Sequence, residues 1–258
     1  MAGLRRLTTA ALDLAFPAAC SGCGREGPPL CATCIPALDA RLGLPGGTPI
    51  GLPADIPAPL LQLEWCAPFA GPVRDGLHDL KYKGERRLAE PFGAAVARRW
   101  SRVGSGAVVV VPVPVHADRE RRRGYDQAAL IAAVAARELG LPLALALERR
   151  RATIAQFELG RHERATNVEG AFAMRRGQPL PGDAHGLHHG DSPAEAGGGF
   201  REESRGRDGS IGTGAVAGRW VLLVDDVVTT GATLAACGMA LRRAGATAVS
   251  AIAVARER

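Results

Sequence analysis

The stretch that most constrains the fold of this chain is residues 221–233, which read VLLVDDVVTTGAT. Four apolar residues in succession are typical of a strand that is buried on both faces of a parallel sheet. Asp225 and Asp226 are expected to end this strand, and a short Thr/Gly loop then leads into a helical pattern. In open α/β sheets, ligands bind outside the carboxyl ends of the strands. The sequence therefore predicts an α/β fold with a ligand site at this point.

The residue types in this stretch suit a phosphorylated sugar. Asp225 and Asp226 are hydrogen-bond acceptors for a vicinal diol such as that of ribose. The residues after them offer hydroxyl groups and the backbone N–H groups of a helix N-terminus, which together form an anion site. The predicted anion site consists of Thr229, Thr230, Gly231, Ala232 and Thr233. The stretch lacks the lysine of a P-loop and the three spaced glycines of a dinucleotide-binding fingerprint.

Four cysteines near the N-terminus form two C-x-x-C pairs, with the spacing Cys20-x2-Cys23-x7-Cys31-x2-Cys34. Each pair lets two sulfur atoms converge on one ion, and four thiolates complete a closed tetrahedral zinc site. Two disulfides are the alternative, although nothing else in the sequence indicates an oxidising compartment. The spacing favours a structural zinc module.

Three further segments concentrate positive charge near predicted strand ends. The first is the basic turn Leu80–Gly84, which carries Lys81. The second follows a Pro-Val-Pro loop and a predicted strand at 107–111, and its arginine forks match phosphate oxygens. The third has the composition of a loop that could close over an anionic ligand. The candidate residues in the second and third segments are Arg119, Arg123, Arg151, Gln156 and Arg161.

The pattern along the chain predicts three parts. Residues 1–42 form an N-terminal helix and the cysteine module, and residues 43–59, rich in Gly and Pro, form a linker. Residues 60–258 form the α/β domain, with strands expected at 60–69, 107–111, 143–147, 170–174 and 247–254. Within this domain, residues 177–218 contain almost no large apolar side chains, which predicts a disordered insertion.

Charge and hydropathy narrow the class of partner. The formal net charge of +6 favours anionic partners, and the aromatic content of 4% argues against a base-stacking platform as the main binding device. The longest apolar run, residues 107–115, is too short to span a bilayer. Asp13 and Pro17 interrupt the N-terminal apolar stretch, so a short amphipathic helix is preferred there over a lipoprotein signal. We expect a cytoplasmic protein without a membrane span.

The order of these motifs resembles the ComF family of phosphoribosyltransferase-like proteins, some of which are called GntX or double zinc ribbon proteins. The stretch 221–233 is similar to the 5-phosphoribosyl 1-pyrophosphate (PRPP) motif of type I phosphoribosyltransferases, and the resemblance covers nearly the whole chain outside residues 177–218. The Pro-Val-Pro loop and residues 151–161 are also similar to the pyrophosphate loop and flexible loop of amidophosphoribosyltransferases. The family usually has Arg-Gly-Phe-Asn-Gln where this chain has Arg-Gly-Tyr-Asp-Gln at 123–127, so that Asp126 adds a negative charge.

The resemblance implies a type I phosphoribosyltransferase-like fold, with a central parallel sheet flanked by helices. It implies transfer of a phosphoribosyl group from Mg²⁺-bound PRPP with release of pyrophosphate, Asp225 and Asp226 acting as the catalytic pair. It also implies an association with DNA uptake in natural competence. A second hypothesis stays open: a non-catalytic PRPP- or nucleotide-binding module that engages single-stranded DNA or a helicase of the uptake machinery. Fold alone does not decide between the two.

Overall fold

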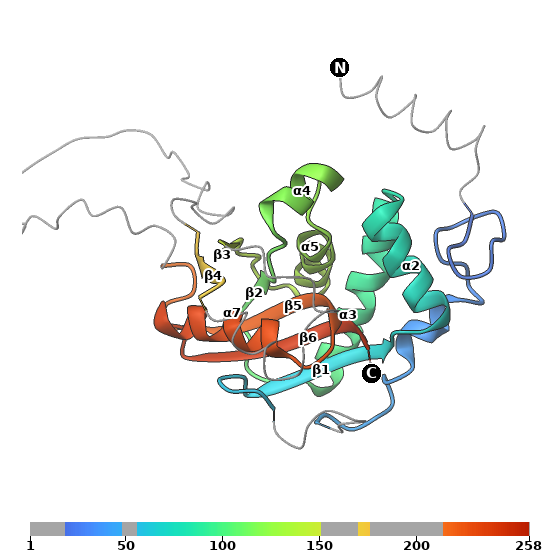
Figure 1. The fold of residues 1–258 in the computed structure, drawn as a ribbon. Coiled ribbons are helices and arrows are strands. Elements are labelled where there is room, and N and C mark those ends of the chain that lie inside the picture. Colours follow the sequence, from blue (N-terminus) through green and yellow to red (C-terminus); the bar gives the residue numbers. More distant parts are fainter. Residues whose placement is uncertain (1–18, 48–55, 151–169, 176–213, 258) are drawn as a thin grey trace, which may run out of the picture.

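The computed structural model describes residues 19–47, 56–150, 170–175 and 214–257. The elements in chain order are η1 (Ile35–Asp39), β1 (Gln62–Pro68), α2 (Gly71–Tyr82), η2 (Arg86–Leu88), α3 (Ala89–Val103), β2 (Val109–Pro112), α4 (Ala117–Arg123), α5 (Gln127–Leu139), β3 (Leu147–Arg149), β4 (Phe172–Met174), β5 (Trp220–Val228), α7 (Ala232–Arg243) and β6 (Ala248–Arg256). Figure 1 shows the sheet at the centre, with helices around it.

The central sheet has four parallel strands in the order β1-β6-β5-β2. It confirms the predicted parallel sheet and the strands expected at 60–69, 107–111 and 247–254. The strand expected at 143–147 is wrong in extent, because Leu143 makes a single parallel bridge to β2 and the regular strand β3 begins only at Leu147. Strand β3 instead pairs antiparallel with β4 in a small separate sheet.

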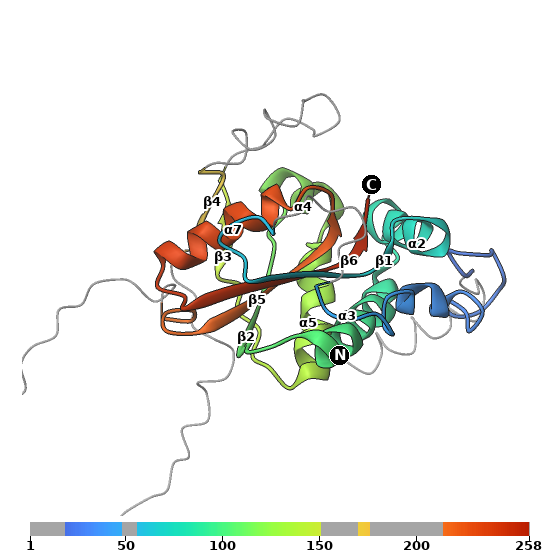
Figure 2. The ribbon, with the colours of Figure 1, turned by 90° about the horizontal axis from the view of Figure 1, so that it is seen from below.

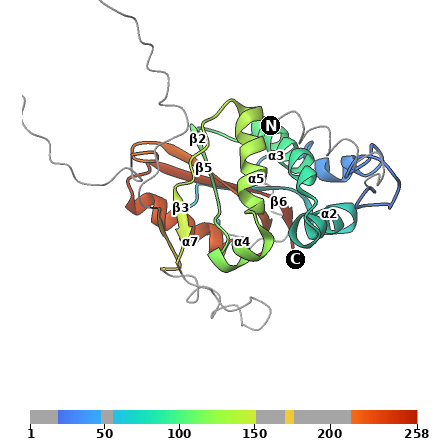
Figure 3. The ribbon, with the colours of Figure 1, turned by 90° about the horizontal axis from the view of Figure 1, so that it is seen from above.

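Helices cover both faces of the sheet, so the domain has three layers. Leu222 and Val224 of β5 belong to an apolar cluster with α2, α3 and α5, whereas Val221 and Leu223 belong to a second cluster with α7. This alternation follows from the two-residue period of a strand, and burial on both faces explains the continuous apolar run. Figures 2 and 3 show α7 on one face, and α3 and α5 on the other.

Helix α5 shows how local sequence fixes these elements. It is rich in alanine, the residue with the highest helix propensity. Asp126 caps its first turn by accepting a hydrogen bond from the N–H of Ala129, and Gly140 ends it in the left-handed conformation with φ 65°. Residues close in sequence thus define both ends of this helix.

The N-terminal cysteine module is part of the same core as the α/β domain. Cys20, Cys31 and Cys34 lie in one apolar cluster with residues of α2, α3 and the sheet. Leu38 of η1 is buried in this cluster, and Asp39 makes an ion pair with Arg98 of α3 at 2.8 Å. The module lies beside α2 in Figures 1 and 3. It therefore packs on the α/β domain without an intervening gap.

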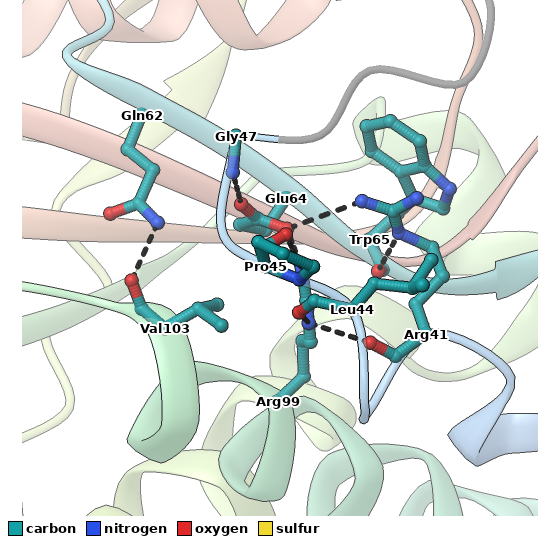
Figure 4. Close-up of polar contacts among 9 residues, drawn as sticks. All are labelled: Arg41, Leu44, Pro45, Gly47, Gln62, Glu64, Trp65, Arg99 and Val103. Carbon is teal, nitrogen blue, oxygen red and sulfur yellow. Dashed lines mark hydrogen bonds and ion pairs between the residues drawn. The ribbon is translucent and has the colours of Figure 1, made fainter.

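A buried ion pair between Glu64 of β1 and Arg99 of α3 holds the first residues of the predicted linker. Glu64 and Arg99 are 0% and 1% exposed, and Arg99 Nη2 lies 2.7 Å from Glu64 Oε2. Arg99 Nη1 donates to the carbonyl oxygens of Arg41 and Leu44, and Glu64 Oε1 accepts from the N–H of Gly47 (Figure 4). Residues 43–47 are thus fixed against β1 and α3, whereas residues 48–55 lie outside the described residues.

Arg41 closes the outer edge of the sheet at β1. Its N–H donates to the carbonyl oxygen of Cys66, and its Nε donates to that of Trp65. Its guanidinium also lies 3.8 Å from the centroid of the Trp65 ring. These contacts occupy backbone groups that an edge strand otherwise offers to another chain.

Several expectations fall wholly or partly outside the described residues. These are the N-terminal amphipathic helix, the loop over 151–161 and most of the insertion predicted at 177–218. The end of that insertion differs from expectation, since residues 214–218 form a turn in which Val216 is 0% exposed and packs in the core. The division into 1–42, 43–59 and 60–258 stays a prediction. In the described ranges, no helix combines the length and apolar character needed to cross a membrane.

Replacing Arg99 by Met is expected to lower the free energy of unfolding by about 3 kcal/mol or more, because Glu64 would keep a buried charge that has lost its main partner. The matched control is Arg98→Met, the adjacent helix position, whose side chain is 42% exposed and whose ion pair with Asp39 should contribute less than about 1 kcal/mol. Urea unfolding of the two variants measures the difference. Equal losses would contradict the role assigned to the buried pair.

Candidate functional site

The carboxyl ends of β2 and β5 lie at the topological switch point of the sheet. The two strands are adjacent and parallel, with Pro112 opposite Val224. The chain that follows β2 leads to α5 on one face of the sheet, whereas the chain that follows β5 leads to α7 on the other. In open α/β sheets a ligand binds where the connections diverge in this way. The predicted position of the site is therefore consistent with the observed topology.

Asp225 and Asp226 lie inside β5, which continues to Val228, rather than after its end. Successive side chains of a strand point to opposite faces, but the two adjacent carboxyl groups still lie within hydrogen-bond reach of each other. Asp226 is 6% exposed and lies on the side of α2 and α5, whereas Asp225 lies on the side of α7 and of Arg149. The carboxylate of Asp225 accepts the N–H of Asp226 at 2.8 Å.

A chain of polar contacts links Asp226 to two of the predicted basic segments. Lys81 Nζ, at the end of α2, lies 2.6 Å from Asp226 Oδ2. Gln127 Nε2 donates to the same oxygen at 3.4 Å, and Gln127 Oε1 accepts from Arg123 Nη1 at 2.9 Å. Lys81, Arg123 and Asp226, which the sequence predicted as site residues on separate segments, are thus brought together. We call Lys81, Arg123, Gln127 and Asp226 the polar network.

The two carboxylates titrate in opposite directions. Burial and the charge of Asp226 raise the pKa of Asp225 well above its usual range. Burial also acts to raise the pKa of Asp226, but the charge and hydrogen bond of Lys81 outweigh it and leave that pKa lowered. Burial opposes the charge of Lys81 in turn, and the Asp226 carboxylate raises the pKa of the lysine overall. At neutral pH the site therefore holds a stable Lys81–Asp226 ion pair beside a carboxyl that resists ionisation.

The predicted anion site lies at the start of α7. Gly231 is the N-cap with φ 81°, a left-handed conformation that disfavours a side chain, and a Cβ there would lie 3.0 Å from Pro57 Cγ. Thr230 Oγ1 accepts the N–H of Ala232 at 3.4 Å, and no side chain caps the described helix. Thr229, Thr230 and Thr233 are all partly exposed. Apart from the N–H of Ala232, the N–H groups of the first helical turn are therefore available to an anion.

The turn between α4 and α5 supplies residues that the sequence-based prediction did not select. Gln127 stands inside the quoted Arg-Gly-Tyr-Asp-Gln motif, but nothing local indicated that it would reach Asp226 of β5. Tyr125 donates its hydroxyl to the carbonyl oxygen of Leu80 and lies under the guanidinium of Arg86. These contacts fix the turn against the end of α2, next to Lys81.

Asp126 has a structural role in this turn. One carboxylate oxygen caps α5, and the other accepts the N–H of Val115, which follows the Pro-Val-Pro loop, at 3.1 Å. Burial raises the pKa of Asp126, and these backbone hydrogen bonds oppose that rise. The two oxygens explain an Asp here, since an Asn offers only one side-chain acceptor.

Arg119 does not join the polar network. It lies on the exposed helix α4. The pKa of Arg149 is lowered mainly by burial, and the positive charge of Arg119 lowers it further. Arg149 also lies within electrostatic reach of Asp225, which the sequence did not indicate. Arg151, Gln156 and Arg161 lie outside the described residues, so their place at the site stays a prediction.

The four N-terminal cysteines converge as predicted. The sulfur atoms of Cys20, Cys23, Cys31 and Cys34 all lie within 4.8 Å of one another, and all six cysteines of the chain are free of disulfides. The N–H of Cys31 donates to Cys20 Sγ at 3.3 Å, as in knuckles that stabilise thiolates. Cys66 and Cys237 are buried and lie apart from this cluster, as expected of core residues.

The donor set of the cluster fits a tetrahedral zinc ion. The backbone N–H groups of Cys34 and Thr33 lower the pKa of Cys31 to about 6, whereas burial and the neighbouring sulfurs raise that of Cys34 to about 12. Four thiols this close cannot all ionise without a cation among them. Four thiolates with no open position are the ligands of a structural zinc site. The predicted four-cysteine module is thus confirmed as a cluster with the chemistry of zinc.

Comparisons with known proteins match the part of the chain that carries Gln127, Asp225 and Asp226, whereas Lys81 and Arg123 precede the region matched by the family model. Residues 126–258 match the sequence model of a family described as phosphoribosyl transferase domain. The chain is 28% identical over 237 residues to the "DNA utilization protein YhgH" of Escherichia coli strain K12, covering 89% of this chain and 85% of that protein. It is 27% identical over 235 residues to the protein of the same name from Salmonella typhi, covering 85% and 87%.

Among solved structures, the chain is similar to "Structure of the allosteric regulatory enzyme of purine biosynthesis". The sequence identity is 19%, the TM-score is 0.34, and the match covers 64% of this chain and 26% of that chain.

The opposite pKa shifts predict opposite effects of amide substitution on stability. The pKa of Asp225 is raised, so its ionisation lowers stability as the pH rises above its ordinary pKa of about 4. Asp225→Asn should therefore stabilise the protein at pH 7, on the order of 1 kcal/mol. The pKa of Asp226 is lowered, so Asp226→Asn should destabilise it at pH 7 by about 2 kcal/mol, leaving Lys81 without its partner.

Thermal unfolding from pH 4 to pH 8 measures both effects. The stabilisation by Asp225→Asn should shrink as the pH falls toward 4, because the wild-type carboxyl is then neutral in the unfolded state as well. The destabilisation by Asp226→Asn should persist down to pH 4, because the lowered pKa keeps that carboxylate ionised in the folded state. Destabilisation by Asp225→Asn at pH 7 would contradict the assignment of Asp225 as the group that resists ionisation.

Proposed function

Because the chain belongs to the phosphoribosyl transferase domain family, we propose that it binds PRPP with Mg²⁺ and transfers the phosphoribosyl group to an acceptor, releasing pyrophosphate. The observation that carries this proposal is the polar network at the switch point, where the carboxylate of Asp226 meets Lys81 and, through Gln127, Arg123. Such a site offers acceptors for a diol beside cations for a polyphosphate. The N-terminus of α7 lies at the end of the same strand and suits a terminal phosphate.

Each group in the site has a defined task in this proposal. Asp225 and Asp226 hold the ribose hydroxyls, and the negative charge of Asp226 favours the oxocarbenium-like centre that develops as the leaving group departs. The segment Thr229–Thr233 anchors the 5′-phosphate with N–H and hydroxyl groups. Lys81 and Arg123 hold the pyrophosphate, and Arg119 with the loop that carries Arg151, Gln156 and Arg161 completes that side and excludes water.

Mg²⁺ suits the donor set without a protein cage of its own. This ion is commonly bound by one or two carboxylates together with substrate phosphates, and Asp225 and Asp226 are the carboxylates within the described site. When bound, the ion neutralises charge on the departing pyrophosphate.

The similarity to proteins named for DNA utilization supports a role in DNA uptake or handling. We propose that the chain acts in the cytoplasm, where PRPP is available, as a ComF-like protein associated with DNA that enters during natural competence. The formal net charge of +6 is consistent with an anionic partner of this kind.

A second candidate function is a non-catalytic PRPP- or nucleotide-binding module that engages single-stranded DNA or a helicase of the uptake machinery. The observation that favours it is the surface beside the site. Tyr82 is 66% exposed with Arg123 over its ring at 5.1 Å, and the exposed helix α4 ends in three arginines. An exposed aromatic ring among arginines suits a single strand as well as it suits pyrophosphate.

We also propose that the four-cysteine cluster holds one structural zinc ion. Metal analysis of the purified protein should give about one zinc per chain, and a strong chelator should lower the unfolding temperature because the cluster is part of the core. Protein without metal, carrying two disulfides by mass spectrometry under non-reducing conditions, would instead support the alternative that the sequence left open.

Binding of Mg·PRPP is expected to be abolished when Asp225→Asn and Asp226→Asn are combined, since each ribose acceptor loses one accepting oxygen and the site loses the charge of Asp226. Calorimetry on the wild type and the double variant measures this. The matched control is Glu138→Gln, an exposed carboxylate at the end of α5. Equal affinity for the wild type and the double variant would overturn the site assignment.

Pyrophosphate release separates the two candidate functions. The protein is incubated with Mg·PRPP and a panel of bases, amines and single-stranded DNA, and pyrophosphate is measured. Release that depends on one acceptor supports transfer. Binding of Mg·PRPP without release above background supports the non-catalytic module.

A further inference from the structure

Helix α2 touches the cysteine cluster at its first turn. The backbone of Gly22, in the first knuckle, lies between the cluster and Pro72 of α2. A Cβ at Gly22 would lie 2.7 Å from Pro72 Cβ and 2.8 Å from Cys34 Sγ. No side chain fits into that space, so the loop that holds two of the sulfurs and the start of α2 are in direct contact.

The contact continues along the helix. Val73, Leu77 and Leu80 of α2 lie in one apolar cluster with Cys20, Cys31 and Cys34. Ser21 follows Cys20 in the cysteine module. Its hydroxyl makes a hydrogen bond to the carboxylate of Asp79, which lies in α2. The module therefore holds α2 by packing along its buried face and by a polar contact near its end.

The other end of α2 enters the candidate site. Leu80 is 0% exposed and its carbonyl oxygen accepts the Tyr125 hydroxyl, and the next residue, Lys81, forms the ion pair with Asp226. Pro72 and Lys81 are nine positions apart, which is about 14 Å along a helix axis. A continuous helix of this length moves as a rigid element, so a shift at its first turn displaces Lys81.

We propose that the zinc-loaded cysteine module positions Lys81 by holding helix α2, and that zinc and PRPP consequently bind with positive cooperativity. This inference rests on the proposed function, because Lys81 matters here as a ligand for PRPP. In this proposal the module affects ligand binding as well as the stability of the fold. Loss of the metal frees the knuckle at Gly22, and α2 loses the support that keeps Lys81 Nζ beside Asp226.

Cooperativity of this kind is reciprocal at equilibrium: if zinc raises the affinity for Mg·PRPP by some factor, then Mg·PRPP raises the affinity for zinc by the same factor. We expect a factor of about ten, which is within the usual range of coupling between two sites. The factor should vanish when Lys81 is removed, because the lysine is the point at which α2 contacts the ligand.

The test measures the affinity for Mg·PRPP by calorimetry with zinc-loaded protein and with protein stripped by a chelator. This is done for the wild type, Lys81→Met and the matched control Arg74→Met, which removes an exposed charge from the same helix. Stripping should weaken binding about tenfold in the wild type and in Arg74→Met, and less than about twofold in Lys81→Met. Equilibrium competition with a chromogenic zinc chelator, with and without Mg·PRPP, should return the same factors.

Ser21→Ala tests the same coupling without removal of the metal. It leaves all four cysteines in place and removes the hydrogen bond to Asp79. Zinc content should be unchanged, and the affinity for Mg·PRPP should fall roughly threefold in the wild-type background but not in Lys81→Met. If circular dichroism shows that the zinc-stripped protein is unfolded, the Ser21→Ala measurement alone tests whether the module positions Lys81.

The failure of this inference differs from the failure of the proposed function. Zinc-loaded wild-type protein that does not bind Mg·PRPP would refute the proposed function. Equal binding with and without zinc, or no effect of Ser21→Ala where the stripped protein does not fold, would overturn the positioning role while leaving the site assignment intact.

Discussion

The ion pair between Lys81 and Asp226 joins the three parts of the chain that meet at the site. Lys81 comes from α2, Asp226 from the central strand β5, and Gln127 brings in the turn between α4 and α5. A charge as buried as Asp226 requires a partner, because an isolated carboxylate in a dry environment would become protonated. The position of α2, and with it the contact surface of the cysteine module, is thus tied to the chemistry at the end of β5.

The two aspartates of the site differ in how readily their carboxyl groups ionise. Asp225 is held where its charged form is unfavourable, and burial rather than any missing contact is the main cause. Perturbed groups of this kind are concentrated at functional sites, although structural ion pairs perturb pKa values as well. The Glu64–Arg99 pair is the structural counterpart, since its groups are fully enclosed and fix backbone carbonyls of residues 41–45.

Much of this arrangement could be predicted from local sequence. The continuous apolar run before Asp225 predicted a buried parallel strand, and the spacing of the four cysteines predicted a cluster. Both predictions were possible because both features depend on short-range geometry. The sequence analysis did not predict that Asp225 and Asp226 lie within β5, nor that Asp126 caps α5.

What the sequence did not reveal depends on contacts between distant segments. Gln127 and Asp226 are 99 positions apart, and Glu64 and Arg99 are 35 apart, so no local pattern pairs them. Likewise, Leu143 follows an apolar pattern, but the edge of β2 offers it only one bridge, so regular pairing begins later with β4.

The polar network also indicates how charge must be redistributed when an anionic ligand binds. Lys81 has one ammonium group, and in the described structure Asp226 already engages it at 2.6 Å. A pyrophosphate group would compete with Asp226 for that ammonium, and the carboxylate would then need another cation to keep its charge in a buried position. A divalent metal that arrives with the ligand satisfies that need. Under the proposed function, a metal requirement for ligand binding would thus follow from the ion pair that the protein forms without the ligand.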